Sequence, residues 1–123
     1  MPHTIQNGVL DQETRQCVEE CLRCQSVCLT TVSYCLQKGG KHAEVSHIVT
    51  LLDCADICAT SAAFMLRGSH LHTTTCAACA EVCRVCAESC ASMGDDEVMK
   101  ACADECRRCA ESCEQMAGSH HPR

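Results

Sequence analysis

The sequence predicts an all-α protein, an antiparallel up-down-up-down four-helix bundle with a Cys-lined core. Three segments repeat the pattern Cys-x3-Cys-x2-Cys-x3-Cys, and glycines divide the chain into four stretches of helical length. Both prolines, Pro2 and Pro122, lie at the extremes, so none interrupts a helix. Because residues three and four apart share one face of a helix, each repeat places its four sulfurs on a single stripe.

The expected elements follow from residues that cap or end helices. The helices are expected at about 12–38, 43–67, 71–92 and 96–117. The boundary residues are Asp11 before the first helix, Gly39 and Gly40 after it, Gly68, Gly94, and Asp95 or Asp96 before the fourth. Short links favour antiparallel neighbours. We expect an N-terminal extension at 1–10, the bundle at 11–117 and a C-terminal tail at 118–123.

The repeats, which we call the cysteine ladders, are CVEECLRCQSVC at 17–28, CAEVCRVCAESC at 79–90 and CADECRRCAESC at 102–113. The second expected helix has the same steps of three and four residues along one face, but fewer of these positions are cysteines. Its in-phase residues are His47, Leu51, Cys54, Cys58, Ser61 and Met65. On the other three expected helices, continuing the same spacing beyond the ladders reaches Cys35, His72, Cys76, Met93, Met99 and Met116. Ligand-capable side chains therefore continue beyond the sulfurs of the ladders.

Composition restricts the classes of function. Sixteen of the 123 residues are Cys, whereas one Tyr, one Phe and no Trp leave little material for an ordinary apolar core. A diffuse net charge of −6 argues against nucleic acid, which needs clustered Lys and Arg. We expect no membrane span, because no long uninterrupted apolar run is present. The N-terminal residues show no export signal, so we expect a cytoplasmic protein with reduced thiols.

Three thiol chemistries other than metal storage fit less well. Disulfide scaffolds are small, loop-rich and secreted, whereas these cysteines lie on long helical repeats. A thiol oxidoreductase usually places its CxxC at the start of a helix, which lowers the thiol pKa, and most CxxC units here lie inside helices. An iron–sulfur cluster uses four converging thiolates, far fewer than a line of sulfurs supplies.

Charge balance selects the metal. Thiolate and thioether ligands favour Cu(I) and other soft ions. Zn(II) held by four thiolates would leave about −2 at each site and about −8 in a buried core, which is costly. One Cu(I) per thiolate leaves the core neutral, with a capacity on the order of 15–20 ions per chain if Met and His add sites. A metallothionein-like zinc or cadmium buffer remains the alternative among binding proteins, and a thiol oxidoreductase the alternative among enzymes.

Ladders such as CADECRRCAESC on four consecutive helices resemble the bacterial copper storage proteins, the Csp family, over about residues 12–117. The resemblance implies a cytosolic homotetramer of four-helix bundles, each filled with Cu(I) by its Cys lining, and no enzymatic activity. Its copper donors and acceptors would be the partners. The implied ligands are Cys17, Cys21, Cys24, Cys28, Cys35, Cys54, Cys58, Cys76, Cys79, Cys83, Cys86, Cys90, Cys102, Cys106, Cys109 and Cys113.

The resemblance also implies that copper is taken up at one end of the bundle, through His, Met and Asp. In an up-down bundle, one end gathers Cys35, His47, Cys90, Met93 and Met99, with Asp95 and Asp96 nearby. The family tends to place His between the third and fourth ladders, whereas this chain reads ASMGDDEVMK and is richer in thioether. The opposite end gathers Cys17, Met65, His72, Cys76, Cys113 and Met116, where the methionines are either ligands or apolar plugs.

Overall fold

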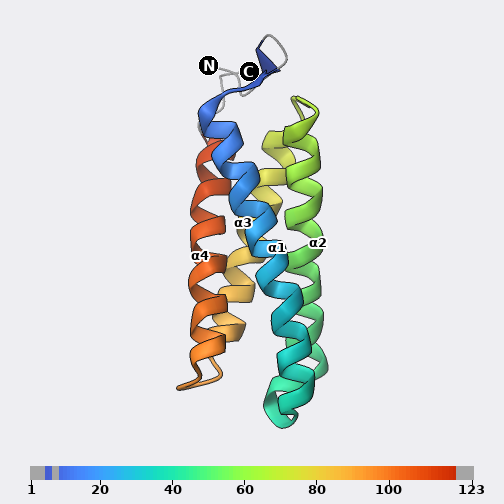
Figure 1. The fold of residues 1–123 in the computed structure, drawn as a ribbon, viewed down its shortest axis with the longest axis vertical. Coiled ribbons are helices and arrows are strands. Elements are labelled where there is room, and N and C mark those ends of the chain that lie inside the picture. The colour runs from blue at the N-terminus through green and yellow to red at the C-terminus, as the bar shows by residue number, and fades with distance from the viewer. Residues whose placement is uncertain (1–4, 7–8, 119–123) are drawn as a thin grey trace.

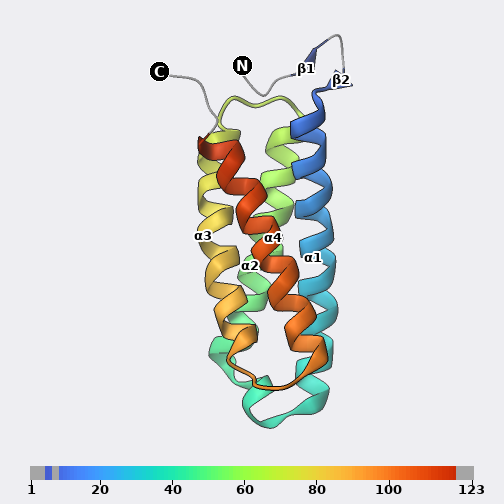
Figure 2. The same ribbon diagram turned by 90° about the vertical axis from the view of Figure 1, so that its left-hand side faces the viewer.

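A computed structural model describes residues 5–6 and 9–118 of the chain. In this part, the four α-helices are α1 (Gln12–Lys38), α2 (Val45–Leu66), α3 (His72–Ala91) and α4 (Glu97–Gly118), with a 3-10 turn, η1 (Gly40–Ala43), after α1. Figures 1 and 2 show them side by side in alternating directions as a long rod. Each helix packs against the next one, and α4 closes the bundle against α1. The predicted all-α up-down-up-down bundle is confirmed.

A short hairpin precedes the bundle and was not expected. Strand β1 (Ile5–Gln6) pairs antiparallel with β2 (Val9–Leu10), with Ile5 opposite Leu10. Leu10 is half-buried and packs against the core. Strands of two residues are too short to show the alternation that marks a strand in a sequence. At the other end, α4 includes Gly118, which we had expected in the tail, and residues 119–123 lie outside the described part.

The helix boundaries are set by the expected kinds of residue. Asp11 caps α1, because its Oδ1 accepts a hydrogen bond of 2.7 Å from the Thr14 amide. Gly39 ends α1 with a φ of 75°, a conformation that favours glycine. Of the two candidates for α4, Asp96 is the cap, since its Oδ1 accepts from the Val98 and Met99 amides. Asp95 instead forms an ion pair of 2.6 Å with Lys100.

The interior consists mainly of thiols and small side chains. All sixteen cysteines are buried, and Ala55, Ala62, Ala80, Ala87, Ala103 and Ala110 fill the flanks between the helices. Alanine brings the helix backbones close together and favours helix intrinsically. Among the described helices, α2 is the one long and apolar enough to cross a membrane by length and composition, a test that core helices of soluble proteins also pass. Its His and Cys stripe faces the bundle core.

One carboxylate is buried outside the thiol core. Glu105 on α4 is 2% exposed, and Arg108 donates a hydrogen bond of 2.9 Å to its Oε1. No described residue donates to its Oε2. Burial, reinforced by the neighbouring carboxylate of Glu20 on α1, raises the pKa of Glu105 to about 7. The sequence gives no sign of this, because Glu105 stands beside charged residues that are exposed.

We predict that Glu105→Gln makes the apo-protein more stable at pH 8 than the parent. With a folded-state pKa of about 7 and an ordinary value of 4.5, the folded protein holds the proton more tightly than the unfolded chain. Stability is therefore lost as pH rises through this window, and glutamine removes that loss. Thermal unfolding should show a gain of several degrees at pH 8 that shrinks towards pH 5. The exposed Glu111→Gln is the control, and equal shifts in both variants would contradict the assignment.

Candidate metal site

The ladders of α1, α3 and α4 and the two cysteines of α2 project onto one axis. Cys17 is 1% exposed and the other fifteen cysteines are 0% exposed. All sixteen lie between residues 17 and 113, within the described part, and each is a free thiol. We call this continuous row of sulfurs the thiol column. It lies where the helical spacing of the sequence predicts it, because four Cys-bearing stripes face the centre of the bundle.

Neighbouring sulfurs in the thiol column are within ligand-sharing distance. Across helices, Sγ of Cys21 lies 3.4 Å from that of Cys113, and Sγ of Cys54 lies 3.6 Å from that of Cys83. Cys58 is 3.7 Å from Cys79 and 3.8 Å from both Cys83 and Cys109. A metal ion held between such sulfurs needs only small side-chain adjustments. These distances are much longer than a disulfide bond of about 2.05 Å.

Twelve of the sixteen sulfurs form overlapping groups. Within each group, all Sγ atoms lie within 4.8 Å of one another. The groups are Cys17–Cys76–Cys113, Cys21–Cys79–Cys109–Cys113, Cys24–Cys58–Cys83–Cys109 and Cys24–Cys28–Cys54–Cys106. Cys113, Cys109 and Cys24 each belong to two groups, so consecutive groups have ligands in common. Such an arrangement suits ions that share bridging thiolates, rather than separate tetrahedral sites with four ligands each.

The thiols differ in how easily they ionise. Burial raises the pKa of Cys35 to about 11. Hydrogen bonding with Cys113 raises the pKa of Cys76 to about 12, whereas hydrogen bonds from Cys109 lower that of Cys21 to about 6. An S–H group that donates to a neighbouring sulfur stabilises the thiolate form of that neighbour. Ten of the sixteen thiols have a raised pKa and six a lowered one, so most of the metal-free column is protonated and a metal ion must displace those protons.

At one end of the column, thiol, thioether and imidazole meet. We call it the uptake end, after the role that the family resemblance implies: there α1 and α3 finish and α2 and α4 begin. Cys35 donates to Met99 Sδ at 3.6 Å, and its Sγ lies 3.4 Å from His47 Nε2. His47 Nδ1 is 2.7 Å from Ser89 Oγ, a partner on α3 that sequence spacing did not indicate. Burial lowers the pKa of His47, which keeps the ring neutral, as a metal ligand requires.

The other candidates at the uptake end lie farther out. Met93 is half-buried in the link between α3 and α4, whereas Met99 is fully buried. Asp95 is exposed in its ion pair with Lys100. Asp96 joins three segments, because its Oδ2 accepts from Tyr34 at 2.8 Å and lies 3.0 Å from His42 Nε2. This polar cluster holds α1, η1 and the start of α4 together, and the cysteine periodicity carries no signal for it.

At the opposite end, which we call the terminal end, α1 and α3 begin and α2 and α4 finish. Met65, His72 and Met116 are each at most 2% exposed there. Cys76 donates to Met65 Sδ at 3.8 Å, and its Sγ lies 3.2 Å from Ser61 Oγ. The structure thus brings Met65 together with a ladder cysteine, as the helical phase of α2 predicted.

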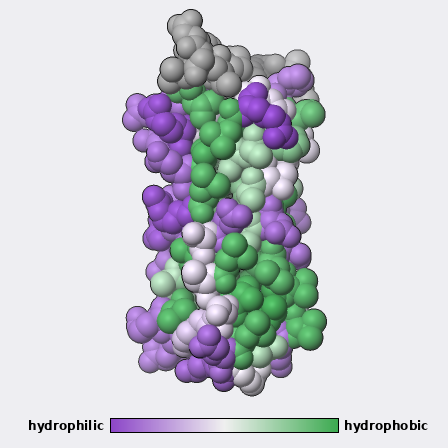
Figure 3. All heavy atoms as spheres, turned by 45° about the vertical axis from the view of Figure 1, so that its right-hand side comes forward, coloured by the Kyte–Doolittle hydropathy of each residue, from purple (hydrophilic) through white to green (hydrophobic). Residues whose placement is uncertain are grey.

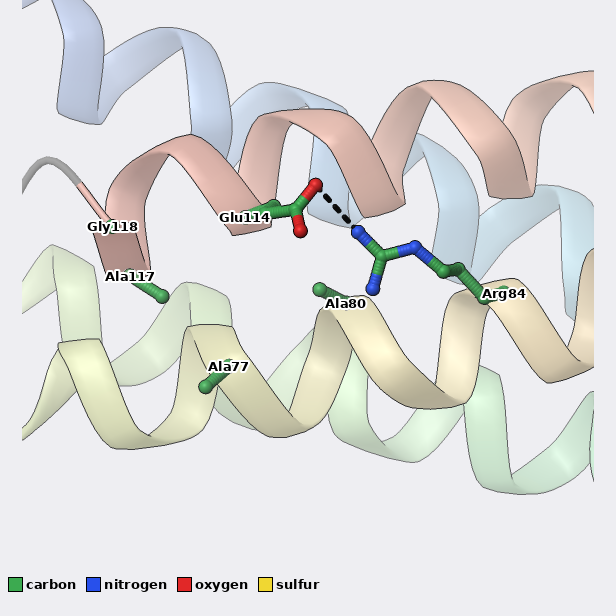
Figure 4. A pocket seen from close by; sticks show the side chains of 6 residues that line it. All are labelled: Ala77, Ala80, Arg84, Glu114, Ala117 and Gly118. Atoms are coloured by element: carbon green, nitrogen blue, oxygen red, sulfur yellow. Dashed lines mark ion pairs between the residues drawn. The ribbon is translucent and has the colours of Figure 1, made fainter.

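Outside the column, α3 and α4 border a shallow groove (Figure 4). Its lining residues are Ala77, Ala80, Arg84, Glu114, Ala117 and Gly118. Arg84 and Glu114 form an ion pair of 2.6 Å across it. None of the lining residues is a thiol, thioether or imidazole, so this groove is not part of the metal site.

Comparison with known proteins identifies the family. The model of the copper storage protein family, Csp, matches residues 10–118. The chain belongs to the copper storage protein family. It is also similar to the solved structure of Cu(I)-bound copper storage protein BsCsp3, with 34% identity and a TM-score of 0.80 over 87% of this chain and 100% of that one.

Two further structures share the fold. A cytosolic copper storage protein from Streptomyces lividans, described with five coppers, is 30% identical, with a TM-score of 0.77 over 89% of this chain and 96% of that one. The Nmul_A1745 protein from Nitrosospira multiformis is 40% identical, with a TM-score of 0.84 over 89% of this chain and 99% of that one. The resemblance inferred from the cysteine ladders is thereby confirmed.

We predict that Cys83→Ser lowers copper capacity by about one or two ions per chain and leaves the helices intact. Cys83 belongs to one group of sulfurs, and its neighbours Cys58 and Cys79 can still bind bridging ions. Titration with Cu(I) and circular dichroism give the two readouts. The control is Ala78→Ser, which adds a hydroxyl to the exposed side of the same helix. Loss of all copper binding from Cys83→Ser would indicate one discrete cluster instead of a shared column.

Proposed function

We propose that this protein stores and sequesters many Cu(I) ions in the cytoplasm, bound by the thiolates of its core. The observation that carries the proposal is the sharing of Cys24, Cys109 and Cys113 between successive groups of sulfurs. Shared ligands let each ion use two or three thiolates while the number of ions approaches the number of cysteines. All sixteen cysteines named from the sequence are the proposed ligands.

The net charge that divalent ions would leave in the buried core argues against zinc and cadmium buffering. Divalent ions in separate four-thiolate sites would leave about −2 at each site, and a column without solvent offers nothing to neutralise it. The described buried residues around the column are mainly thiols and alanines, with a few methionines, two histidines and small polar side chains, and no Lys or Arg is among them. Cu(I) at about one ion per thiolate leaves no net charge. The monovalent soft ion therefore fits this interior best.

We further propose that the protein is not an enzyme. A thiol oxidoreductase needs a thiolate that its substrate can reach. Here the CxxC pairs Cys21/Cys24, Cys83/Cys86 and Cys106/Cys109 lie within helices, and their six sulfurs are 0% exposed. A bulky disulfide substrate could not approach them without opening the bundle. A small ion that moves from ligand to ligand has no such difficulty.

Copper uptake is proposed at the end where Cys35, His47 and Met99 meet. A thioether and a neutral imidazole hold Cu(I) without losing a proton, whereas the Cys35 thiol must lose one. Ser89 would orient His47, as hydrogen-bonded partners orient metal-binding histidines. Met93, half-buried at the surface of this end, is the proposed first contact for an incoming ion. Asp95 and Asp96 act there through charge and helix capping.

The proposed compartment is the cytoplasm, and the proposed partners are copper donors and acceptors. The Streptomyces lividans relative is described as cytosolic, which supports the compartment. A reducing environment also keeps sixteen closely spaced thiols available to copper. We propose no binding to nucleic acid or membrane, in keeping with the net charge of −6 and a buried Cys face on α2.

The outer face of α1 and α2 supports self-association, and the homotetramer itself is what the family resemblance implies. Leu22, Leu29 and Leu36 recur at intervals of seven on α1 and are 43%, 45% and 55% exposed. Val49 and Leu52 of α2 are also exposed. Figure 3 shows apolar side chains gathered on the α1–α2 side of the rod. Such a patch marks an association surface, and a second copy that presents the same face is its proposed occupant.

The reduced apo-protein is predicted to bind Cu(I) to a plateau near its sixteen cysteines and to bind little Zn(II). The reason is the neutral core that only a monovalent ion at this ratio provides. Native mass spectrometry under reducing conditions measures the number of ions directly. A plateau at about four or fewer ions per chain would contradict the proposal, because separate four-thiolate sites give that number.

Replacing Leu29 by Glu is predicted to reduce the oligomer to smaller species while copper capacity per chain stays unchanged. A charge at the centre of the α1 leucine row would have to be buried between chains without a partner. Light scattering coupled to size-exclusion chromatography gives the molar mass. Val85→Glu, at an exposed apolar residue of α3, is the matched control. The same mass for parent and Leu29→Glu would place the interface on another face.

A further inference from the structure

The terminal end of the bundle repeats the donor set of the uptake end. At the uptake end Cys35 donates to a methionine sulfur at 3.6 Å, and at the terminal end Cys76 does so at 3.8 Å. Each end also has a histidine that is 2% exposed, His47 in one case and His72 in the other. The two ends thus match in thiol, thioether and imidazole, although they are built from different helices.

The two histidines are also held in similar ways. His47 Nδ1 lies 2.7 Å from Ser89 Oγ, and His72 Nδ1 lies 2.7 Å from the carbonyl oxygen of Ser69. A carbonyl only accepts hydrogen bonds, so Nδ1 of His72 is the donor in this contact. Metal-binding histidines are commonly oriented by a hydrogen bond from the second ring nitrogen.

The thiol column reaches this end without a break. Cys17, Cys76 and Cys113 form the last group of sulfurs, and Cys113 also belongs to the next group inward. Ser61 Oγ lies 3.2 Å from Cys76 and adds a polar atom beside a sulfur that a plain apolar plug would not need. An ion in the column can therefore exchange ligands, one sulfur at a time, until it contacts Cys76 and Met65.

We propose that the terminal end is a second copper port, at which Met65 exchanges Cu(I) with Cys76. The inference rests on the proposed storage of Cu(I). The ion stays monovalent throughout: a bond to the Met65 thioether forms while a bond to the Cys76 thiolate breaks. The thiolate then takes a proton from water, and the copper passes to a soft-donor acceptor outside. The column would be filled and emptied through two ends instead of one.

If copper leaves through both ends, the release rate is the sum of two routes, and blocking one end lowers it only in part. The protein is loaded to half capacity without oxygen, and transfer to an excess of a high-affinity Cu(I) chelator is followed by absorbance. Met65→Leu and Met99→Leu conserve volume and apolarity, so the fold is retained. With equal flux through the two ends, each single variant is expected to lose up to about twofold in rate and the double variant more than about tenfold, because rates through parallel routes add.

The matched control is Leu10→Ile, which conserves volume and apolarity in a residue packed against the core beside the start of α1, at the same end. It removes no ligand atom, so its rate should equal that of the parent. A Met65→Leu rate equal to the parent, with the double variant no slower than Met99→Leu, would show a closed end and overturn the second port. Equal slowing by Leu10→Ile would assign the effect to packing and overturn the second port as well.

Total capacity, measured on the same samples, separates this inference from the proposed function. A parent that binds copper near its cysteine count, together with unaffected release in Met65→Leu, contradicts the second port alone. A parent that binds only a few ions contradicts storage itself.

Discussion

The sixteen thiols lie along one axis of the bundle and are shielded from solvent. The free energy cost of placing net charge there determines which metal ions the bundle can bind. Without metal, protonated thiols behave as small apolar side chains and pack between alanines. Each proton that leaves must be replaced by another positive charge, or the thiolates would repel one another in a medium of low dielectric constant. A monovalent soft ion satisfies this condition one site at a time. The storage function thus follows from the same burial that holds the helices together.

The ends of the bundle differ from its centre, because thioether and imidazole groups lie there beside the thiols. A column of buried thiols needs a place where a copper ion exchanges its outside ligands for the first thiolate. Thioether and neutral imidazole do this without changing the charge of the interior. Met99 is placed against Cys35 because Asp96 caps α4 three residues before it. The cap, the helix start and the position of the Met99 thioether therefore depend on one carboxylate, which also binds Tyr34 and His42.

Much of this arrangement was predictable from the sequence. Steps of three and four residues can be satisfied only by helices, and the ladders therefore indicated both the bundle and its Cys lining. Even His47 and Met65 followed from the phase of α2, although that helix has only two cysteines. The metal class followed from the donor atoms and the charge balance. These properties depend on local spacing and composition, which a single sequence contains.

Contacts between distant segments were not predictable. Ser89 supports His47 across the α2–α3 interface, and Glu105 is buried because of how α4 lies against α1. The Tyr34–Asp96–His42 cluster joins residues up to 62 positions apart. Which of two equivalent aspartates caps α4 was settled by the ion pair of Asp95 with Lys100. Such partners depend on the relative rotation of helices, which no repeat in the sequence specifies.

The most direct test of the neutral-core account is the number of protons released for each Cu(I) bound, measured in lightly buffered solution near pH 7. The account predicts an average close to one proton per ion up to saturation, because each copper replaces a thiol proton and the charge of the interior does not change. Thiolates that are already formed would reduce the value in proportion to their number, and hydrogen bonds from neighbouring thiols favour that form at Cys21 and five other cysteines. An average below about one half would contradict the account, because the column would then hold unneutralised charge before copper arrives.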